Sequence, residues 1–150
     1  MDSKKPDFLY QAYGAAWYVA SGLLALSPRM RKGYGQRVGF EKAPDRADIW
    51  IQAASGGESF LAAQIIRNLP RPKDPAKAIK VLVTTTTPQG MGVLDKLKVE
   101  MNLLRREGAP QVQTSYFPFD RPTLMSAWME SVLPRAVVLL ETELWPGLMR

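Results

Sequence analysis

The 150-residue sequence predicts an α/β fold, in which a parallel β-sheet carries helices on both faces. Short apolar runs alternate along the chain with stretches of helical spacing, and this alternation is typical of parallel βαβ units. Glycine or proline stands in each loop that follows an apolar run, where the chain has to turn. Apolar residues make up 46% of the chain, which is enough for the hydrophobic core of one ordinary domain.

Local spacing and residue type predict the first two strands and helices. Residues 49–54 (IWIQAA) form a short apolar run, and helical spacing follows over 60–69. Residues 79–85 (IKVLVTT) are rich in β-branched side chains and predict the second strand. A second helix is predicted from Pro88 to about Arg106, because proline in the first turn lacks only an N–H that the helix does not need there.

The second half of the chain repeats the alternation. A third strand is predicted at 112–117, a helix from Pro122 to just before Pro134, and a fully apolar strand at 136–140 (AVVLL). In a Rossmann-like sheet of this kind, ligands bind outside the carboxyl ends of the strands. Any site should therefore be built from the four loops after the strands, which are 55–58, 84–89, 117–121 and 141–145.

Residues 1–32 are predicted to form a membrane-associated helix with a basic flank, and residues 33–150 the α/β domain. The mostly uncharged stretch 8–26 is about 19 residues long, near the lower limit for crossing a bilayer. Its tyrosine and tryptophan side chains favour the headgroup region, and the basic residues after it favour an anionic surface. We therefore expect an interfacial or shallowly anchored helix, with the rest of the chain in the cytoplasm. A buried amphipathic helix and a signal peptide are the alternatives.

Composition excludes several kinds of chemistry. The chain has neither cysteine nor histidine, which rules out disulfides, thiolate metal sites, most zinc sites and the Ser-His-Asp triad. Acid–base chemistry must come from Asp, Glu, Lys, Tyr or water. The sequence has no Asp-x-Asp motif or other acidic cluster, so no metal is expected, and no cofactor either. The net charge of +6 favours anionic lipid or phosphorylated substrates, whereas nucleic acid is disfavoured because zinc-finger, KH and RRM signatures are missing.

The loop Ser55-Gly56-Gly57-Glu58 admits two interpretations. Its glycines allow a tight turn and the close approach of a ligand to the backbone. Ser55 and Glu58 have the spacing of a capping box, in which each side chain satisfies a backbone N–H of the other residue. Alternatively, Glu58 is the general base of a site at the strand ends. It is the best-placed candidate in a chain without histidine, although the helix N-terminus lowers the pKa of its carboxyl group.

The next two loops carry hydroxyl and aromatic side chains. Thr84-Thr85-Thr86-Thr87 precedes a proline, so Thr87 is expected to cap the helix after it. These hydroxyls, at a helix N-terminus, are also candidates for holding a phosphate or sugar hydroxyls. In the third loop, Asp120 is expected to cap the following helix, and Phe117 and Phe119 to lie in the core or at its rim.

The fourth loop, Glu141-Thr142-Glu143-Leu144-Trp145-Pro146, follows the fully apolar strand directly. Two carboxylates and a tryptophan at the end of a buried strand are an unusual combination. Acidic residues just before a helix also suit the helix dipole, which is the structural alternative. The cost of placing acids beside a buried strand favours a functional use, so Glu141 and Glu143 are candidate site residues.

In order and spacing, these motifs resemble the amino-terminal domain of the 3-deoxy-D-manno-octulosonic acid (Kdo) transferases, glycosyltransferases of the GT-B type that act on lipid A. The resemblance covers nearly the whole chain, including the basic segment 33–39, and its most specific part is ETELWP. Gln52 stands where the family usually has His, and Gly56 where it usually has Val, but Glu58 is in place. The matching runs are WIQAASGGE, VTTTTPQG, FPFD and ETELWP.

The resemblance implies metal-independent, inverting transfer of Kdo from CMP-Kdo to a lipid A precursor. The reaction belongs to lipopolysaccharide core biosynthesis and takes place at the cytoplasmic face of the cell inner membrane. Glu58 would be the general base, and Glu141 or Glu143 would orient it or the acceptor. Ser55–Gly57 would shape the turn, while Thr84–Thr87 and nearby basic residues would hold acceptor hydroxyls and phosphates. Such enzymes bind most of the donor with a carboxy-terminal domain that this chain lacks, so the chain alone is expected to be inactive.

Two other functions remain open at this stage. One is a GT-B glycosyltransferase with a different acceptor or keto-sugar, which transfer assays on purified acceptors would distinguish. The other is a non-catalytic, membrane-docked remnant that binds anionic lipid. About 200 further residues with a βα pattern in the coding DNA would favour an enzyme over this remnant.

Overall fold

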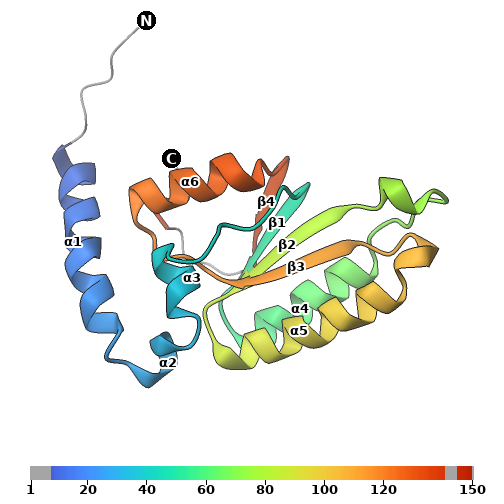
Figure 1. The fold of residues 1–150 in the computed structure, drawn as a ribbon, viewed down its shortest axis with the longest axis horizontal. Coiled ribbons are helices and arrows are strands. Elements are labelled where there is room, and N and C mark those ends of the chain that lie inside the picture. The colour runs from blue at the N-terminus through green and yellow to red at the C-terminus, as the bar shows by residue number, and fades with distance from the viewer. Residues whose placement is uncertain (1–7, 141–144, 150) are drawn as a thin grey trace, which may run out of the picture.

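The structure is a computed structural model that describes residues 8–140 and 145–149. Four parallel strands form one sheet in the order β3-β2-β1-β4 (Figure 1). In its centre, Ile51 lies opposite Val83 on one neighbouring strand and Val138 on the other. The strands are β1 (Ile49–Ala53), β2 (Lys80–Thr85), β3 (Gln111–Tyr116) and β4 (Ala136–Leu139). The parallel α/β sheet that the sequence predicts is confirmed.

Helices cover both faces of this sheet. Helices α4 and α5 lie on one face and α6 lies on the other, while α1, α2 and α3 precede β1 and lie near one end of the sheet (Figure 1). The helices are α1 (Phe8–Leu24), α2 (Pro28–Arg31), α3 (Tyr34–Val38), α4 (Gly56–Arg67), α5 (Pro88–Leu103) and α6 (Pro122–Val132). Short 3-10 turns lie at Pro75–Lys77 and Arg105–Glu107.

Two helix boundaries differ from those that spacing predicts, and local chemistry explains both. Helix α4 begins at Gly56 rather than near residue 60, because the capping box at Ser55 starts the helix directly after the strand. Helix α5 ends at Leu103 rather than near Arg106. The residues after it form a 3-10 turn that closes on Gly108, whose φ of 75° lies in the left-handed region that glycine tolerates.

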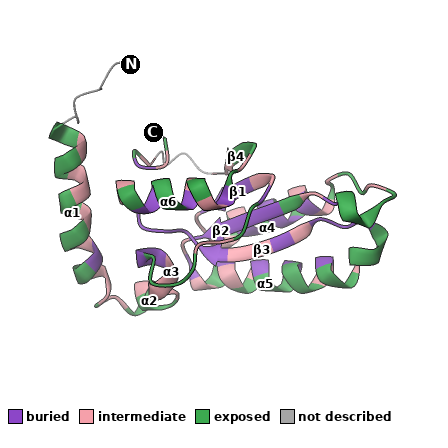
Figure 2. Cartoon of the chain, turned by 45° about the horizontal axis from the view of Figure 1, so that its top comes forward, coloured by how far each residue is buried: buried purple, intermediate pink, exposed green. Residues whose placement is uncertain are grey.

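Side chains that alternate along the strands build one core on each face of the sheet. Ile51 and Val83 pack with α4 and α5, whereas Trp50 and Leu82 pack with α6. The rings of Trp50 and Trp128 lie 5.6 Å apart between sheet and helix. Figure 2 shows the buried residues concentrated along β1, β2 and part of β3 and on the inward sides of these helices. Each such side chain stabilises the fold by about 1.5–3 kcal/mol, so the frame that carries the loops is rigid. The prediction that the last strand is buried is wrong, because β4 lies at the edge of the sheet and its residues are exposed or half-buried.

The inner side of α1 packs against the loops at the carboxyl ends of the strands. Trp17 stacks on Phe119 with the ring centroids 5.7 Å apart, and the Tyr13 hydroxyl donates a hydrogen bond of 2.6 Å to Asp120. Burial and this hydrogen bond raise the pKa of Tyr13 to about 12. Two of the aromatic side chains that the sequence assigns to a headgroup region are therefore in contact with protein.

The outer side of α1 is apolar and open to solvent. Its exposed large side chains are Phe8, Leu9, Tyr18, Val19 and Leu23. Within residues 8–140 and 145–149, no helix is both long and apolar enough to cross a membrane. Association of α1 with a membrane surface stays a prediction.

Candidate active site at the carboxyl edge of the sheet

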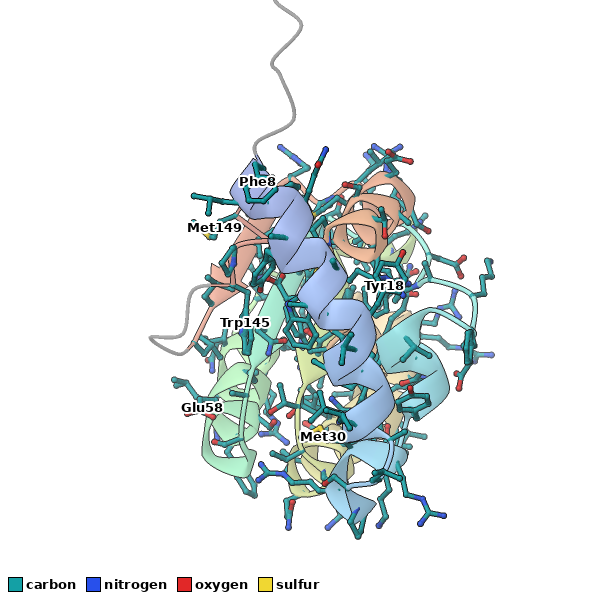
Figure 3. The ribbon with its side chains drawn as sticks, turned by 90° about the vertical axis from the view of Figure 1, so that its left-hand side faces the viewer. Phe8, Tyr18, Met30, Glu58, Trp145 and Met149 are labelled. Carbon is teal, nitrogen blue, oxygen red and sulfur yellow. The ribbon has the colours of Figure 1, made fainter. Side chains whose placement is uncertain are left out.

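Loops from three strands meet at the carboxyl edge of the sheet, where parallel strands all end. A cleft of about 720 Å³ lies between the loops after β1 and β2 and helix α2, and Arg29 and Lys32 add positive charge to its wall. A smaller cavity of about 260 Å³ lies between α1 and the loops after β2 and β3. Figure 3, viewed onto α1, shows Glu58, Met30 and Trp145 on the same side of that helix. A further cavity of about 280 Å³, at the opposite edge, contains none of the predicted site residues.

Ser55 and Glu58 form the capping box that their spacing predicts. The Ser55 backbone N–H donates to Oε2 of Glu58 at 2.6 Å, and the Glu58 N–H donates to Oγ of Ser55 at 3.4 Å. The Ser55 hydroxyl also donates to Oε2. Ser55 and Gly56 line the larger cleft, whereas Gly57 and Glu58 follow them in the chain and are not part of its lining.

The charge state of Glu58 follows from these contacts. The hydrogen bond from the Ser55 hydroxyl holds the pKa of the carboxyl group below its usual range, and partial burial opposes this effect. Glu58 is therefore a carboxylate at neutral pH. The hydrogen bonds that the described residues donate to the Glu58 carboxylate all end on Oε2, which leaves Oε1 able to accept a proton from a bound molecule.

The four threonines after β2 separate into an inner and an outer pair. Thr84 and Thr85 are fully buried, and the Thr84 hydroxyl bonds to the Trp50 indole at 2.8 Å and to the Gln52 amide at 2.5 Å. Gln52 is likewise buried within the sheet. Only Thr86 and Thr87 line a cavity, so they alone are placed to contact a ligand.

The outer pair also has structural partners. The Thr87 hydroxyl accepts the Gly90 N–H at 3.0 Å, which confirms the predicted cap of α5. The Thr86 hydroxyl donates to the Ala54 carbonyl and so joins the loop after β2 to the loop after β1. These bonds fix the two backbones that frame the larger cleft.

The predicted cap by Asp120 is wrong. Arg121 is the residue at the N-cap of α6, and it makes no capping hydrogen bond. The Asp120 carboxylate turns instead into the space between α1 and the end of the chain, where it accepts bonds from the Tyr13 hydroxyl at 2.6 Å, the Gly147 N–H at 2.7 Å and the Leu148 N–H at 2.9 Å. Burial raises its pKa, and these bonds oppose the rise.

The two phenylalanines around Asp120 are buried, as the sequence predicts. Phe117 packs in the core beneath α6, and Phe119 packs against Trp17. Glu141 and Glu143 lie outside the described residues, so their candidate roles stay predictions. Trp145, the next described residue, lines the smaller cavity, and its ring centroid lies 6.2 Å from that of Trp17.

Arg37 is a site residue that the sequence places only among the basic residues after the amino-terminal helix, in the segment 33–39. Its side chain is 1% exposed and lines the smaller cavity. The guanidinium donates to the carbonyls of Lys32 and Thr86 and lies 4.3 Å above the Tyr116 ring. Burial lowers its pKa to about 10, so it still carries a positive charge at neutral pH. The glycines on both sides of it, at 33 and 39, have positive φ and allow the turns that begin and end α3.

The described residues show no group of three or more acidic side chains that could hold a metal ion. The arrangement supplies instead one carboxylate with a free oxygen, a basic cleft beside it, and an aromatic cavity that contains a buried cation. Such an edge suits the binding of an anionic molecule and the removal of a proton from it.

Comparison with known proteins gives the family. The family model described as 3-deoxy-D-manno-octulosonic-acid transferase (kdotransferase) matches residues 32–150. The 3-deoxy-D-manno-octulosonic acid transferase of Haemophilus influenzae is 31% identical over 131 residues, which cover 85% of this chain and 28% of that protein. The probable mitochondrial 3-deoxy-D-manno-octulosonic acid transferase of Arabidopsis thaliana is 29% identical over an alignment of 151 residues, which covers 94% of this chain and 31% of that protein.

The chain spans less than a third of the length of these two relatives. A further 3-deoxy-D-manno-octulosonic acid transferase, from Bordetella pertussis, is 29% identical over 107 residues, or 71% of this chain and 23% of that protein. No solved structure matches the chain significantly. Because the family model covers most of the sequence, the chain belongs to the 3-deoxy-D-manno-octulosonic acid (Kdo) transferase family.

Proposed function

We propose that this chain is the acceptor-binding part of an enzyme that transfers Kdo from CMP-Kdo to a lipid A precursor in lipopolysaccharide core biosynthesis. Membership of the Kdo transferase family supports the donor sugar. The observation that carries the proposal is the Glu58 carboxylate, which lies on the turn beside a basic cleft at the carboxyl edge and has one oxygen that no described residue binds. A second domain, beyond the length of this chain, would bind most of the donor.

Glu58 is the general base in this proposal. A hydroxyl of the acceptor attacks the anomeric carbon of Kdo, the bond from that carbon to the phosphate oxygen breaks, and CMP leaves with the electron pair. Oε1 of Glu58 takes the proton of the attacking hydroxyl, while the Ser55 hydroxyl and N–H hold Oε2 in place. A bound acceptor would exclude water and raise the lowered pKa of Glu58 toward the range of an effective base. The reaction is inverting and needs no metal.

The surroundings of Glu58 match an acceptor that carries phosphates and acyl chains. Arg29 and Lys32 line the cleft and would contact acceptor phosphates. The exposed apolar side of α1, followed by Arg29, Arg31 and Lys32, would hold the domain at the cytoplasmic face of the inner membrane, where the acceptor resides. Of the candidate threonines, Thr86 and Thr87 line the two cavities and would bind acceptor hydroxyls.

A transfer assay tests the proposal. The complete protein that contains this chain is incubated with CMP-Kdo and lipid A precursor in detergent, and mass spectrometry measures the gain of Kdo. Glu58→Gln should lower the rate by roughly two orders of magnitude or more. It should fold normally, because glutamine also serves in a capping box. Glu130→Gln, a change of an exposed carboxyl group on α6, is the matched control. Turnover in Glu58→Gln equal to that of the control would reject the base assignment.

The exposed apolar side of α1 also favours a second function, docking of a non-catalytic chain on anionic lipid. Binding to anionic vesicles without any gain of Kdo in the transfer assay would support that function. A gain of a different sugar, or on a different acceptor, would indicate another glycosyltransferase of the same fold.

A further inference from the structure

The smaller cavity contains a buried cation that no described carboxylate neutralises. Arg37 lies on α3 and is 1% exposed. Within residues 8–140 and 145–149, three ion pairs form within 4 Å, and none of them includes Arg37. Its Nε donates to the Lys32 carbonyl at 3.3 Å, and its Nη2 donates to the Thr86 carbonyl at 2.8 Å. The positive charge is therefore solvated by two carbonyl groups and by no anion of the described chain.

A purely structural role accounts for only part of this guanidinium. The two carbonyl bonds and the Tyr116 ring use Nε, Nη2 and one planar face. Nη1 makes no hydrogen bond to a described residue, although the guanidinium lines a cavity of about 260 Å³. Burying a charge without an opposite charge is costly, so an anion in this cavity would offset a cost that the described residues leave uncompensated.

A second donor in the same wall also has no acceptor. The Trp145 indole N–H is buried and makes no hydrogen bond to any described group. Asp120, the acidic side chain that lines the cavity, is already engaged by three donors. The remaining wall is largely aromatic, formed by Trp17, Phe117 and Phe119. The Arg37 cation and the Trp145 N–H, with aromatic rings beside them, suit the binding of an oxyanion attached to a sugar ring or an apolar group.

This cavity is connected to the candidate base through short contacts. Arg37 donates to the Thr86 carbonyl, and the Thr86 hydroxyl donates to the carbonyl of Ala54, the residue before the capping box of Ser55 and Glu58. Figure 3 shows Trp145 and Glu58 on the same side of α1. An anion at Arg37 would therefore lie against the same loop that frames the cleft beside Ser55 and Gly56.

We propose that the cavity under α1 is an oxyanion subsite, in which Arg37 and Trp145 bind a phosphate or carboxylate group of a sugar substrate. The class of the substrate rests on the proposed function: the group is either a phosphate of the acceptor or the carboxylate of Kdo. Rings of Trp17 and Phe119 would contact the sugar or its apolar substituent. The cavity is smaller than the usual site for a drug-sized ligand, so it would take one charged group and its nearest ring rather than the whole molecule.

Binding to the 150-residue chain in detergent tests the subsite without any turnover. Tryptophan fluorescence is a suitable signal, because two of the four tryptophans, Trp17 and Trp145, line the cavity. The probes are a short N-acyl glucosamine 1-phosphate, the same compound without phosphate, inorganic phosphate, and free Kdo. We expect the phosphorylated sugar or Kdo to bind at least about tenfold more tightly than the uncharged sugar, the effect of one charge-assisted hydrogen bond.

Variants of Arg37 and Trp145 then separate the subsite from the fold. Arg37→Met should remove the preference for the charged probe, and Arg37→Lys should keep part of it. Trp145→Phe, which keeps a ring but removes the N–H, should weaken binding about three- to tenfold. If Arg37→Met does not fold, this second variant still tests the subsite. Arg106→Met, a change of an exposed arginine in a 3-10 turn, should leave the preference unchanged.

The outcomes distinguish the two sources of the anion. Arginine-dependent binding of the sugar phosphate assigns the subsite to the acceptor, whereas arginine-dependent binding of free Kdo assigns it to the Kdo carboxylate. Equal affinity for charged and uncharged probes, or unchanged affinity in both Arg37→Met and Trp145→Phe, would overturn the proposal. Because binding is measured without a donor, absence of Kdo transfer by the complete protein would refute the proposed function and leave this result standing.

Discussion

Removal of the Asp120 side chain should separate α1 and the end of the described chain from the sheet. Its carboxylate is 1% exposed and accepts three hydrogen bonds, from the Tyr13 hydroxyl and the backbone N–H groups of Gly147 and Leu148. A side chain at Gly147 would clash with it, since a Cβ atom there would lie 2.6 Å from Oδ1. Asp120→Ala therefore leaves three donors without the acceptor that they share.

The magnitude follows from these three bonds. A hydrogen bond to a charged group contributes about 1.5–3 kcal/mol, and truncation also leaves its donor unpaired. Burial of the carboxylate, which raises its pKa, offsets part of this gain. We expect Asp120→Ala to lower the free energy of unfolding by about 3–5 kcal/mol, and Tyr13→Phe, which removes one bond, by about 1.5 kcal/mol.

Urea unfolding of the 150-residue chain, followed by circular dichroism and tryptophan fluorescence, measures both changes. The pH dependence gives a second test. Because the pKa of Asp120 is raised in the folded state, its contribution to stability is greatest below the unfolded pKa and declines as pH rises through the folded pKa. Asp120→Asn should remove this decline. A loss below about 1 kcal/mol in Asp120→Ala would refute the idea that this carboxylate joins three segments.

Two further predictions concern the turns at the carboxyl edge. Gly90→Ala should destabilise the fold by about 1–3 kcal/mol, because the new Cβ would lie 2.2 Å from the buried Thr85 hydroxyl. Gly92→Ala is the control: its Cβ would have nothing within 4 Å, so it should stabilise the helix by up to about 1 kcal/mol. Thermal unfolding compares the two variants, and equal melting temperatures would contradict the close approach at Gly90. Ser55→Ala should lower the free energy of unfolding by about 1 kcal/mol and raise the pKa of Glu58. Because the pKa of Glu58 is lowered in the folded protein, its stabilising contribution is present above the unfolded pKa and is lost as pH falls through the folded pKa. Carboxyl chemical shifts during an acid titration measure that pKa, and an unchanged value in Ser55→Ala would show that the hydroxyl does not set it.

The parts of the fold that depend on neighbouring residues were predictable from the sequence. The alternation of strands and helices, the edge at which the loops meet, and the caps at Ser55 and Thr87 all follow from patterns within a few residues. Among the predicted caps, the one at Asp120 was wrong. There the same local rule predicts a cap, but a tyrosine more than a hundred residues away and two backbone groups compete successfully for the carboxylate.

Arg37 could not have been recognised from the sequence for a related reason. Beside Arg29, Arg31 and Lys32 it has the appearance of one more residue of a basic flank. Its burial results from the packing of α3 against the Tyr116 ring and from the Thr86 carbonyl, both far away in the chain. The packing of α1 against the loops was not predicted for the same reason. Aromatic side chains in a sequence look the same whether they contact lipid headgroups or, as Trp17 does, another aromatic ring such as Phe119.

The strand order has a consequence for how this chain reaches its native state. The strands β1, β2 and β3 follow one another both in sequence and in the sheet. The connection from β3 to β4 runs through α6 and crosses one face of the sheet before β4 pairs with β1. Pairing β4 with β1 closes a loop of more than half of the chain, and closing this loop costs conformational entropy before the strands gain any contact. This pairing should therefore form late in folding. The edge of β1 is then open for as long as β4 is undocked, and α6, which packs Trp128 on Trp50 of β1, should set how long that interval lasts. Substitutions in α6 should therefore change the yield of folded chain more than they change the chemistry at the carboxyl edge.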